Sequence, residues 1–198
     1  AQVEPRVVDL ATGNFVTDID PAEFDARTAA KDPEQNVVIP GDEDIASIRS
    51  RAKYATVYFV KEGERAGLMI MPVHGYALWS TLYGFIALES DGQTVYGLSF
   101  YEHAETPGLG GEIDNPKWKS LWRGKQVFDE QGQMRLQVIK GSVTEDTPGA
   151  EHKVDGLAGA TLTSVGVSNL LRYWLSDQGY GPFLEKVRSG EVQVVNNG

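Results

Sequence analysis

A run of small residues and hydroxyls, DGLAGATLTS, occupies residues 155–164 and leads into a strongly helical segment. Its two glycines permit left-handed or crowded backbone conformations, and its alanines leave space above the main chain. The start of a helix adds unpaired N–H groups and a partial positive charge, so the pattern is typical of an anion site, above all for phosphate. The structural alternative is that Thr163 or Ser164 caps the helix and that the glycines only form a turn.

The stretch matches neither of two common nucleotide-binding signatures. No Lys follows the glycines at the spacing of a Walker A loop, and the dinucleotide fingerprint GxGxxG is absent. The three histidines, His74, His103 and His152, lack the short spacing and accompanying carboxylates of a metal site, so we expect surface or capping roles for them. No catalytic-triad signature is present. The residue patterns therefore nominate neither a metal centre nor catalytic residues.

A second unusual stretch, EHAETPGLGGEID, follows a predicted strand. Thr106 precedes Pro107 and is expected to be extended. Three glycines surround Leu109, so this loop can bring backbone amides against a flat ligand with that leucine lying on its face. A long, flexible hairpin connection is the alternative. In the segment HGYALWS, Trp79 is either a core residue or a platform for a ligand.

Composition narrows the class of protein. The chain has 198 residues, 41% of them hydrophobic, and a formal charge of −10, which is ordinary for a globular domain. No basic stripe is visible, so nucleic acid is not an expected partner. The chain contains no cysteine, which excludes thiol nucleophiles and cysteine-held metal clusters. No stretch approaches the roughly 20 apolar residues of a membrane span.

The elements that must position these stretches are predicted from periodicity and turn signals. Residues 1–40 favour an irregular arm with one short helix near residues 21–32, and residues 41–52 favour a helix with an acidic first turn. Runs rich in β-branched and aromatic residues predict two hairpins, one with its loop at Glu62-Gly63-Glu64 and one turning at Asp91-Gly92. A short helix capped by Asn115 and a fifth strand follow, the latter over residues 134–141.

The C-terminal helix has the strongest signal. An apolar stripe recurs at helical spacing, Gly179 ends the helix, and a second short helix over residues 182–190 follows. The stripe comprises Val167, Leu170, Leu171, Trp174 and Leu175. The sequence therefore predicts an α+β fold, an antiparallel sheet built of hairpins with flanking helices. We divide it into an N-terminal arm (1–40) and one domain (41–198).

The two unusual stretches together resemble the FMN-binding domain family. DGLAGATLTS stands before an amphipathic helix, and ETPGLGG lies some fifty residues earlier. Within the family the chain is similar to flavin-carrying subunits of sodium-translocating NADH:quinone reductases, and more distantly to a subunit of the Rnf complex. The resemblance extends over nearly the whole chain, through the segments EPRVVDLATGNF, HGYALWS, YEHAETPGLGGEI and GYGPFLEKVR.

The resemblance implies a covalent flavin. In this family a dedicated flavin transferase joins FMN, through its phosphate, to the hydroxyl of the Thr that closes a Ser/Thr-Gly-Ala-Thr motif, and Thr161 stands at that position. The family usually has Ser or Thr where this chain has Ala158. The missing hydroxyl removes a possible contact with the phosphate or the transferase, which bears on how completely flavin is attached.

The resemblance also implies roles for other residues. Trp79 would neighbour the flavin ring, Lys140 would be a positive partner for the phosphate or the reduced flavin, and Asp155 would make a turn or transferase contact. The isoalloxazine site would be lined by Glu105, Thr106, Pro107, Gly108 and Leu109. The phosphate end would be supported by Gly159, Ala160 and Thr163.

The implied function is that of a soluble periplasmic domain of an inner-membrane NADH:quinone reductase, relaying electrons inside the sodium-pumping complex. Its partners would be the other subunits of that complex and, during maturation, the flavin transferase. A transmembrane helix preceding these residues would anchor it. We expect the isolated domain not to turn over NADH, because it lacks a nicotinamide-binding fingerprint. The alternative is a non-redox module, binding a phosphate-bearing ligand reversibly or serving as a structural part of a membrane assembly.

Overall fold

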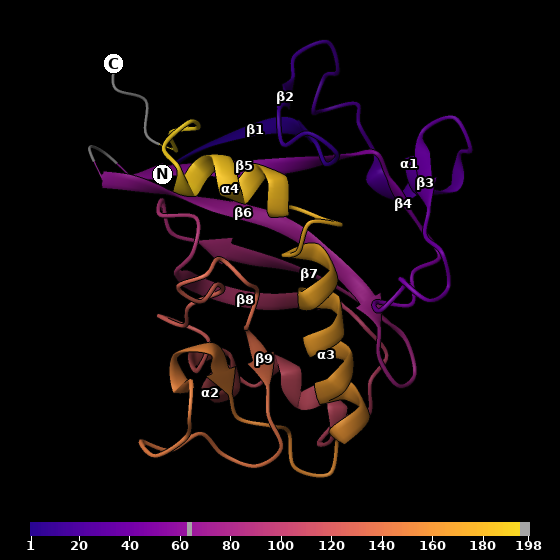
Figure 1. Ribbon diagram of the computed structural model, residues 1–198. Coiled ribbons are helices and arrows are strands. Elements are labelled where there is room, and N and C mark those ends of the chain that lie inside the picture. The colour runs from indigo at the N-terminus through magenta and orange to yellow at the C-terminus, as the bar shows by residue number, and fades with distance from the viewer. Residues whose placement is uncertain (63–64, 195–198) are drawn as a thin grey trace.

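The computed structural model describes residues 1–62 and 65–194. Its centre is an antiparallel sheet of six strands in the order β2-β1-β5-β6-β7-β8, with two small two-stranded sheets beside it (Figure 1). The mixed architecture with a mainly antiparallel sheet confirms the predicted fold class. The strands of the main sheet are β1 (Gln2–Asp9), β2 (Phe15–Val16), β5 (Tyr54–Glu62), β6 (Arg65–Tyr76), β7 (Thr81–Leu88) and β8 (Val95–Glu102). The remaining elements are α1 (Ala26–Lys31), β3 (Asn36–Val38), β4 (Ser50–Ala52), η1 (Gly110–Asp114), α2 (Pro116–Ser120), β9 (Gln137–Val138), η2 (Ala150–His152), β10 (Lys153–Val154), α3 (Thr161–Trp174) and α4 (Gly181–Arg188).

Both predicted hairpins are confirmed. β5 pairs with β6, and β7 pairs with β8 around the expected turn. In that turn the Asp91 carboxylate accepts hydrogen bonds from the backbone N–H groups of Gln93 and Thr94, and Gly92 has a φ of +69°. An Asx turn followed by a left-handed residue explains the signal. The loop residues Gly63 and Glu64 of the other hairpin lie outside the described residues.

The prediction of an irregular N-terminal arm is wrong for residues 2–9. They form β1, which pairs with β5 over eight residues, from Gln2 opposite Lys61 to Asp9 opposite Tyr54. The short helix predicted in this region is confirmed as α1, capped by Asp25. The division into an arm of residues 1–40 and a domain of residues 41–198 stays a prediction, although β1 and β5 lie on opposite sides of it.

The helix predicted for residues 41–52 is also wrong. The segment forms turns and then β4, and the carboxylate of Asp44 accepts hydrogen bonds from the backbone N–H groups of Ile48 and Arg49. Ser47 and Arg49 adopt positive φ angles of 53° and 68°, which no α-helix tolerates. A carboxylate that binds nearby backbone N–H groups offers the chain an alternative to a helix.

The remaining helices follow their local signals. Asn115 caps α2, and its side chain accepts a hydrogen bond from the N–H of Lys117. The short helix α4 is confirmed, as is the apolar stripe of α3, every member of which is buried. The predicted fifth strand is reduced to β9, which pairs in parallel with β10 and takes no part in the main sheet.

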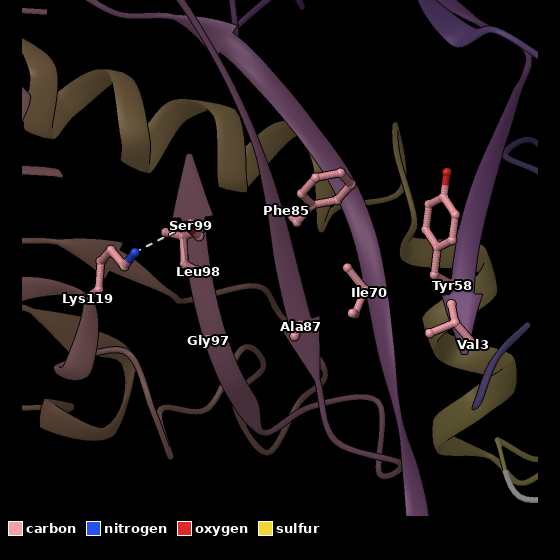
Figure 2. Close-up of a pocket in the computed structure, with 9 residues that line it drawn as sticks. All are labelled: Val3, Tyr58, Ile70, Phe85, Ala87, Gly97, Leu98, Ser99 and Lys119. Atoms are coloured by element: carbon pink, nitrogen blue, oxygen red, sulfur yellow. Dashed lines mark hydrogen bonds between the residues drawn. The ribbon is translucent and has the colours of Figure 1, made fainter. Parts of the chain in front are cut away.

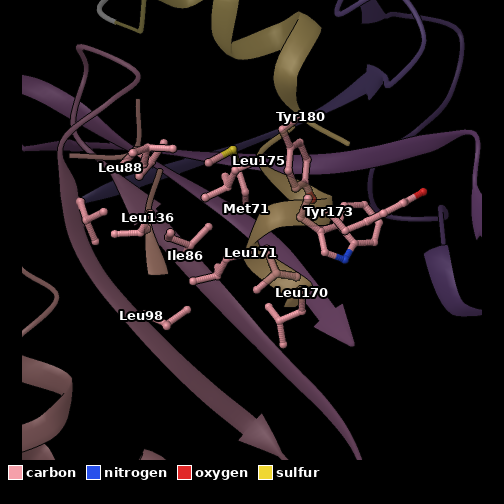
Figure 3. Packing of buried hydrophobic residues seen from close by; sticks show 14 of the residues in the cluster. Met71, Ile86, Leu88, Leu98, Leu136, Leu170, Leu171, Tyr173, Leu175 and Tyr180 are labelled. Atoms are coloured by element: carbon pink, nitrogen blue, oxygen red, sulfur yellow. The ribbon is translucent and has the colours of Figure 1, made fainter. Parts of the chain in front are cut away.

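The core lies between one face of the main sheet and the helices α3 and α4 (Figures 1 and 3). Alternate residues of β7 point into it, so that Leu82, Ile86 and Leu88 are all fully buried. From α3, Leu170 and Leu171 meet these strands, as Figure 3 shows. The burial of two matching apolar faces holds α3 against the sheet.

The opposite face of the sheet carries a shallow apolar hollow of about 610 Å³ (Figure 2). Small residues, Ala87 and Gly97, form its floor, while Phe85 and Val3 remain 37% and 55% exposed beside it. Lys119 closes one side and donates a hydrogen bond to the hydroxyl of Ser99. Lys119 of α2 therefore borders the hollow, whereas Arg27 of α1 covers Tyr83 elsewhere on the same face.

The main sheet splits between β5 and β6. Their register pairs run from Tyr58 opposite Ile70 toward the hairpin loop, and none joins residues 54–57 to residues 71–76 in the described chain. Pro72 stands at the start of the split and has no N–H to donate to β5. Two side chains supply the missing donors: the hydroxyl of Tyr180 donates to the Pro72 carbonyl at 2.6 Å, and the indole N–H of Trp174 donates to the His74 carbonyl at 2.7 Å.

This arrangement predicts that Tyr180→Phe lowers the free energy of unfolding by about 1–3 kcal/mol, because it leaves the partly buried carbonyl of Pro72 without its donor. Urea unfolding followed by circular dichroism measures the change. Tyr96→Phe is the matched control, since Tyr96 is 40% exposed and its change is expected to stay within about 0.5 kcal/mol. Equal stability of the two variants would contradict this account of the split.

Candidate functional site

The helix α3 begins at Thr161 itself. Its N-cap residue is Ala160, and no side chain caps the helix. Thr163 and Ser164 are buried inside the first turns, so the structural alternative of a capping hydroxyl is wrong. Thr161, by contrast, is exposed at the first helical position, where the backbone N–H groups have no partners within a helix. The structure thus separates one accessible hydroxyl from two buried ones.

The glycines before the helix serve the two purposes expected from the sequence. Gly159 has a φ of +70°, a left-handed conformation that L side chains rarely adopt. At Gly156 a Cβ atom would lie 2.3 Å from the carbonyl oxygen of Ile139. One glycine therefore makes the turn into the helix, and the other allows two backbone segments to touch.

A cavity of about 430 Å³ opens beside the start of α3, and we call it the α3 cavity. Lys140 and Thr161 both line it. Asp155 holds the loop of Lys140 in place, because its carboxylate accepts a hydrogen bond from the N–H of Val143 at 2.8 Å. This turn contact is one of the two expected of Asp155. The lining consists of residues 138–142, residues 156–159, Thr161, Ser164 and Val165.

A buried carboxylate joins three segments at the other side of the helix start. Glu105 is 4% exposed, and its two oxygens accept four hydrogen bonds of 2.8–3.1 Å. Leu78 and Trp79 donate from their backbone N–H groups, and Ser80 and Thr163 donate from their hydroxyls. The turn at residues 77–80, the loop that carries Glu105 and the first turn of α3 are thereby tied together.

The same bonds decide the charge of Glu105. Burial alone would raise its pKa, but the hydrogen bonds from Leu78, Thr163, Trp79 and Ser80 favour the charged form and outweigh it. The pKa of this carboxyl therefore lies below its ordinary value, and the group is an anion at neutral pH. Because both oxygens are occupied within the protein, Glu105 acts as a positioning residue for the site.

The predicted ligand loop is ordered by this anchor. The Thr106 carbonyl accepts hydrogen bonds from the N–H groups of Leu109 and Gly111, so the loop closes on itself and runs into η1. At Gly110 a Cβ atom would lie 2.4 Å from the Thr163 hydroxyl. The alternative of a long flexible connection is therefore wrong. Thr106, Pro107 and Gly108 are exposed beside the anchored Glu105.

Exposed apolar side chains surround the start of α3. Leu109 is 46% exposed, and a Cβ at Gly159 would lie 3.1 Å from its side chain. Trp79 is 65% exposed, so its interpretation as a core residue is wrong. Leu162 and Val165 project from the helix itself with 58% and 47% exposure. We call these four side chains the apolar rim.

Within the described residues, no group of three or more histidine or acidic side chains could hold a metal ion. The same residues include no helix that is long and apolar enough for a membrane span. His103 contacts Asp114 at 2.7 Å and His152 contacts the Gln126 carbonyl, but both side chains are only 12% exposed, so neither is a surface histidine. His74 differs, because its ring packs between Tyr83 and Trp174.

The structure divides the predicted site residues between two sides of the helix start. Lys140, Gly159 and Thr161 line the α3 cavity, whereas Glu105, Thr163 and the loop lie on the side of Trp79. The Thr163 hydroxyl donates to Glu105 and so does not face the cavity. Sequence reasoning missed Ser80 and Ser142 and considered Ser164 only as a helix cap; Ser80 was visible only as the last residue of HGYALWS, and Ser142 lies outside the unusual stretches.

Comparison with known proteins places this geometry in a family. The family model of the FMN-binding domain matches residues 77–176, which include both halves of the site. The chain is 53% identical over 192 residues to the NqrC subunit of the Na(+)-translocating NADH-quinone reductase of Pseudomonas aeruginosa, covering 97% of this chain and 74% of that protein. The corresponding subunit of Neisseria meningitidis is 49% identical over 193 residues, with 97% and 73% covered.

Two solved structures have the same fold. The crystal structure of Shewanella oneidensis NqrC superposes with a TM-score of 0.86 at 37% identity, covering 94% of this chain and 84% of that one. The crystal structure of the same subunit from Parabacteroides distasonis gives a TM-score of 0.66 at 30% identity, with 91% and 77% covered.

The role of Glu105 as an anchor predicts a pH-dependent effect of Glu105→Gln. At pH 7 the variant loses about 2–4 kcal/mol of unfolding free energy, because a neutral amide presents N–H groups to backbone donors. The folded-state pKa is depressed, so the carboxylate contributes fully above its ordinary pKa of 4.5 and loses that contribution as the pH falls through the folded value.

The difference between wild type and Glu105→Gln should therefore shrink between about pH 5 and pH 3. Urea titrations at stepped pH measure it, and the other carboxyl groups cancel because both proteins contain them. Glu112→Gln is the control, since Glu112 bonds only the Asn115 side chain among the described contacts. A difference that stays constant with pH would refute the assigned role.

Proposed function

The chain belongs to the FMN-binding domain family and, within it, to the NqrC subunits of the Na(+)-translocating NADH-quinone reductases, and from this premise we propose that Thr161 carries FMN as a covalent phosphoester. The protein is an electron-relaying flavoprotein subunit of that oxidoreductase complex. The observation that carries the covalent proposal is the contrast among the hydroxyls of α3: Thr161 is exposed at the first helical position, while Thr163 and Ser164 are buried and bonded.

The residues present fit such a group. The α3 cavity, at about 430 Å³, lies within the usual range of small-molecule sites, and Thr161 is in its wall. An ester of threonine with a flavin phosphate keeps one negative charge, which the helix N-terminus favours. Lys140 lines the same cavity and adds a positive charge. A Cβ at Gly156 would collide with Ile139, so the cavity depends on that glycine.

The apolar rim supports the proposal for the ring end. Leu109 and Trp79 present exposed apolar surface on the side of the helix where Glu105 fixes the loop. We assign the isoalloxazine ring to this side, with Thr106, Pro107 and Gly108 as backbone neighbours. FMN supplies the redox chemistry when bound, and the chain supplies attachment, orientation and the local electrostatics.

The accessibility of Thr161 also supports a maturation enzyme. A flavin transferase must reach the hydroxyl, and small residues at 158–160 leave it uncovered. Ala158 is exposed in the same turn, so a hydroxyl there would face the incoming phosphate or transferase. We assign the domain to the periplasmic side of the inner membrane, with a transmembrane anchor that precedes these residues and with the other subunits of the complex as its partners.

The covalent proposal predicts that Thr161→Ala, produced together with a flavin transferase, carries no flavin. Intact mass spectrometry should show wild type heavier by FMN less one water, and the variant at its bare mass. Thr161→Ser should keep the adduct, because the attacking hydroxyl remains. Leu162→Ala is the fold control at the neighbouring exposed position.

Flavin that leaves wild type on denaturation would indicate reversible binding. An adduct that persists in Thr161→Ala would place the ester on another residue. Either result would overturn the covalent proposal while leaving family membership intact.

The position of Lys140 predicts an effect on potential. Lys140→Gln should retain the covalent flavin but make its midpoint potential more negative by roughly 20–40 mV, the equivalent of about 0.5–1 kcal/mol for a positive charge lost near a solvent-exposed site. Spectroelectrochemical titration measures it. Lys119→Gln, on the outer face of the sheet, removes the same charge away from the α3 cavity and should leave the potential unchanged. Equal shifts in both variants would show a general charge effect.

A further inference from the structure

The split between β5 and β6 contains a second cavity, of about 410 Å³, which we call the split-sheet cavity. Trp174 and Tyr180 line it; these are the side chains that donate to the two β6 carbonyls that are not paired with β5. Residues of α1 and the turn before β4 line it as well. Its volume falls within the range of small-molecule sites. It lies at the far end of α3 from Thr161, about 20 Å away along a helix of 14 residues.

Aromatic rings that pack on one another line the cavity. The ring of His74 stacks on Tyr83 with centroids 5.4 Å apart and an interplanar angle of 17°, and it lies tilted against Trp174 at 5.1 Å. Burial, together with the nearby charge of Arg27, lowers the pKa of His74 to about 4, so its ring is neutral at pH 7. The other aromatic rings in the lining are those of Phe24, Tyr54, Tyr58, Tyr83 and Tyr101.

All the charged side chains that line the cavity are cationic. Arg27, Lys31 and Arg49 line it, and no Asp or Glu is among its lining residues in the described chain. The absence of acidic residues from the described lining contrasts with the net charge of −10 of the whole protein. A cavity with one sign of charge in low-dielectric walls attracts ligands of the opposite sign.

Arg27 is placed to receive an anion. Its guanidinium carbon lies 3.4 Å from the centroid of the Tyr83 ring, and its N–H groups donate to Glu102 and to the Tyr101 hydroxyl. The side chains of Arg27 and Glu102 are 45% and 56% exposed, so their ion pair is weak and readily exchanged. A planar carboxylate can accept two parallel hydrogen bonds from a guanidinium group.

We propose that the split-sheet cavity binds a planar organic anion, an aromatic ring that carries a carboxylate. The ring lies among the tyrosines and beside the neutral His74, and the carboxylate bonds Arg27 in place of Glu102. This site is separate from the α3 cavity and adds to the electron-carrying function rather than depending on it.

Isothermal titration calorimetry with naphthalene-2-carboxylate tests the proposal, and naphthalene-2-carboxamide serves as the uncharged analogue of the same shape. The carboxylate should bind wild type about tenfold more tightly than the amide. Arg27→Gln should remove about that factor for the carboxylate and leave amide binding unchanged. Lys119→Gln, outside the cavity, should alter neither ligand's affinity.

A second variant locates the ring. Ala55→Leu adds volume at the cavity wall and should weaken both ligands alike. Equal affinity of carboxylate and amide for wild type, or undiminished carboxylate binding in Arg27→Gln, would overturn the proposal, as would absence of binding by wild type. These measurements require no flavin, so their failure is distinguishable from failure of the covalent assignment.

Discussion

The geometry of the candidate site depends on one buried carboxylate. Glu105 accepts bonds from the turn at residues 77–80 and from Thr163, which lies 58 positions along the chain. A buried charge is tolerated only while its hydrogen bonds are made, so losing one donor exposes the remainder to an uncompensated desolvation penalty. This anion therefore adds a polar link among three segments that the apolar core also holds together. The places of Leu109 and of the start of α3 both follow from it.

Signals within a short stretch of sequence were sufficient to predict the structure where contacts within that same stretch decide it. The turn at Asp91-Gly92 forms because a carboxylate bonds its own chain and glycine takes a left-handed conformation. The apolar stripe of α3 predicts by itself that this side of the helix packs against an apolar face of the sheet. The conformation of Gly159 follows from the absence of a Cβ. The hydroxyl of Thr161 could be singled out only through family resemblance, because its sequence context contains two further hydroxyls.

The sequence-based predictions were wrong where contacts between distant parts of the chain decide the local structure. Four of the eight residues of β1 are exposed at its outer end, which hides the alternation that marks a strand, and only its pairing with β5 orders it. The acidic start of residues 41–52 resembles a helix, yet Asp44 bonds the following backbone instead. The split of the sheet has one local signal, because Pro72 inside a predicted strand indicates lost pairing. The partners that replace that pairing, Tyr180 and Trp174, lie some hundred residues away and could not be inferred.

The packing of α3 bears on whether its two ends can communicate. A Cβ at Gly166 would lie 2.8 Å from the Cα of Ala77, and a Cβ at Gly75 would lie 2.5 Å from the Cβ of Leu170. The helix α3 therefore packs closely against residues 75–77 at two levels, and each contact leaves no room for a side chain on the glycine. Coupling between sites requires an element with two arrangements, and this close packing favours a single place for the helix. We therefore expect a ligand among the tyrosines to leave the start of α3 unmoved, and that rigidity suits the proposed attachment of a cofactor there.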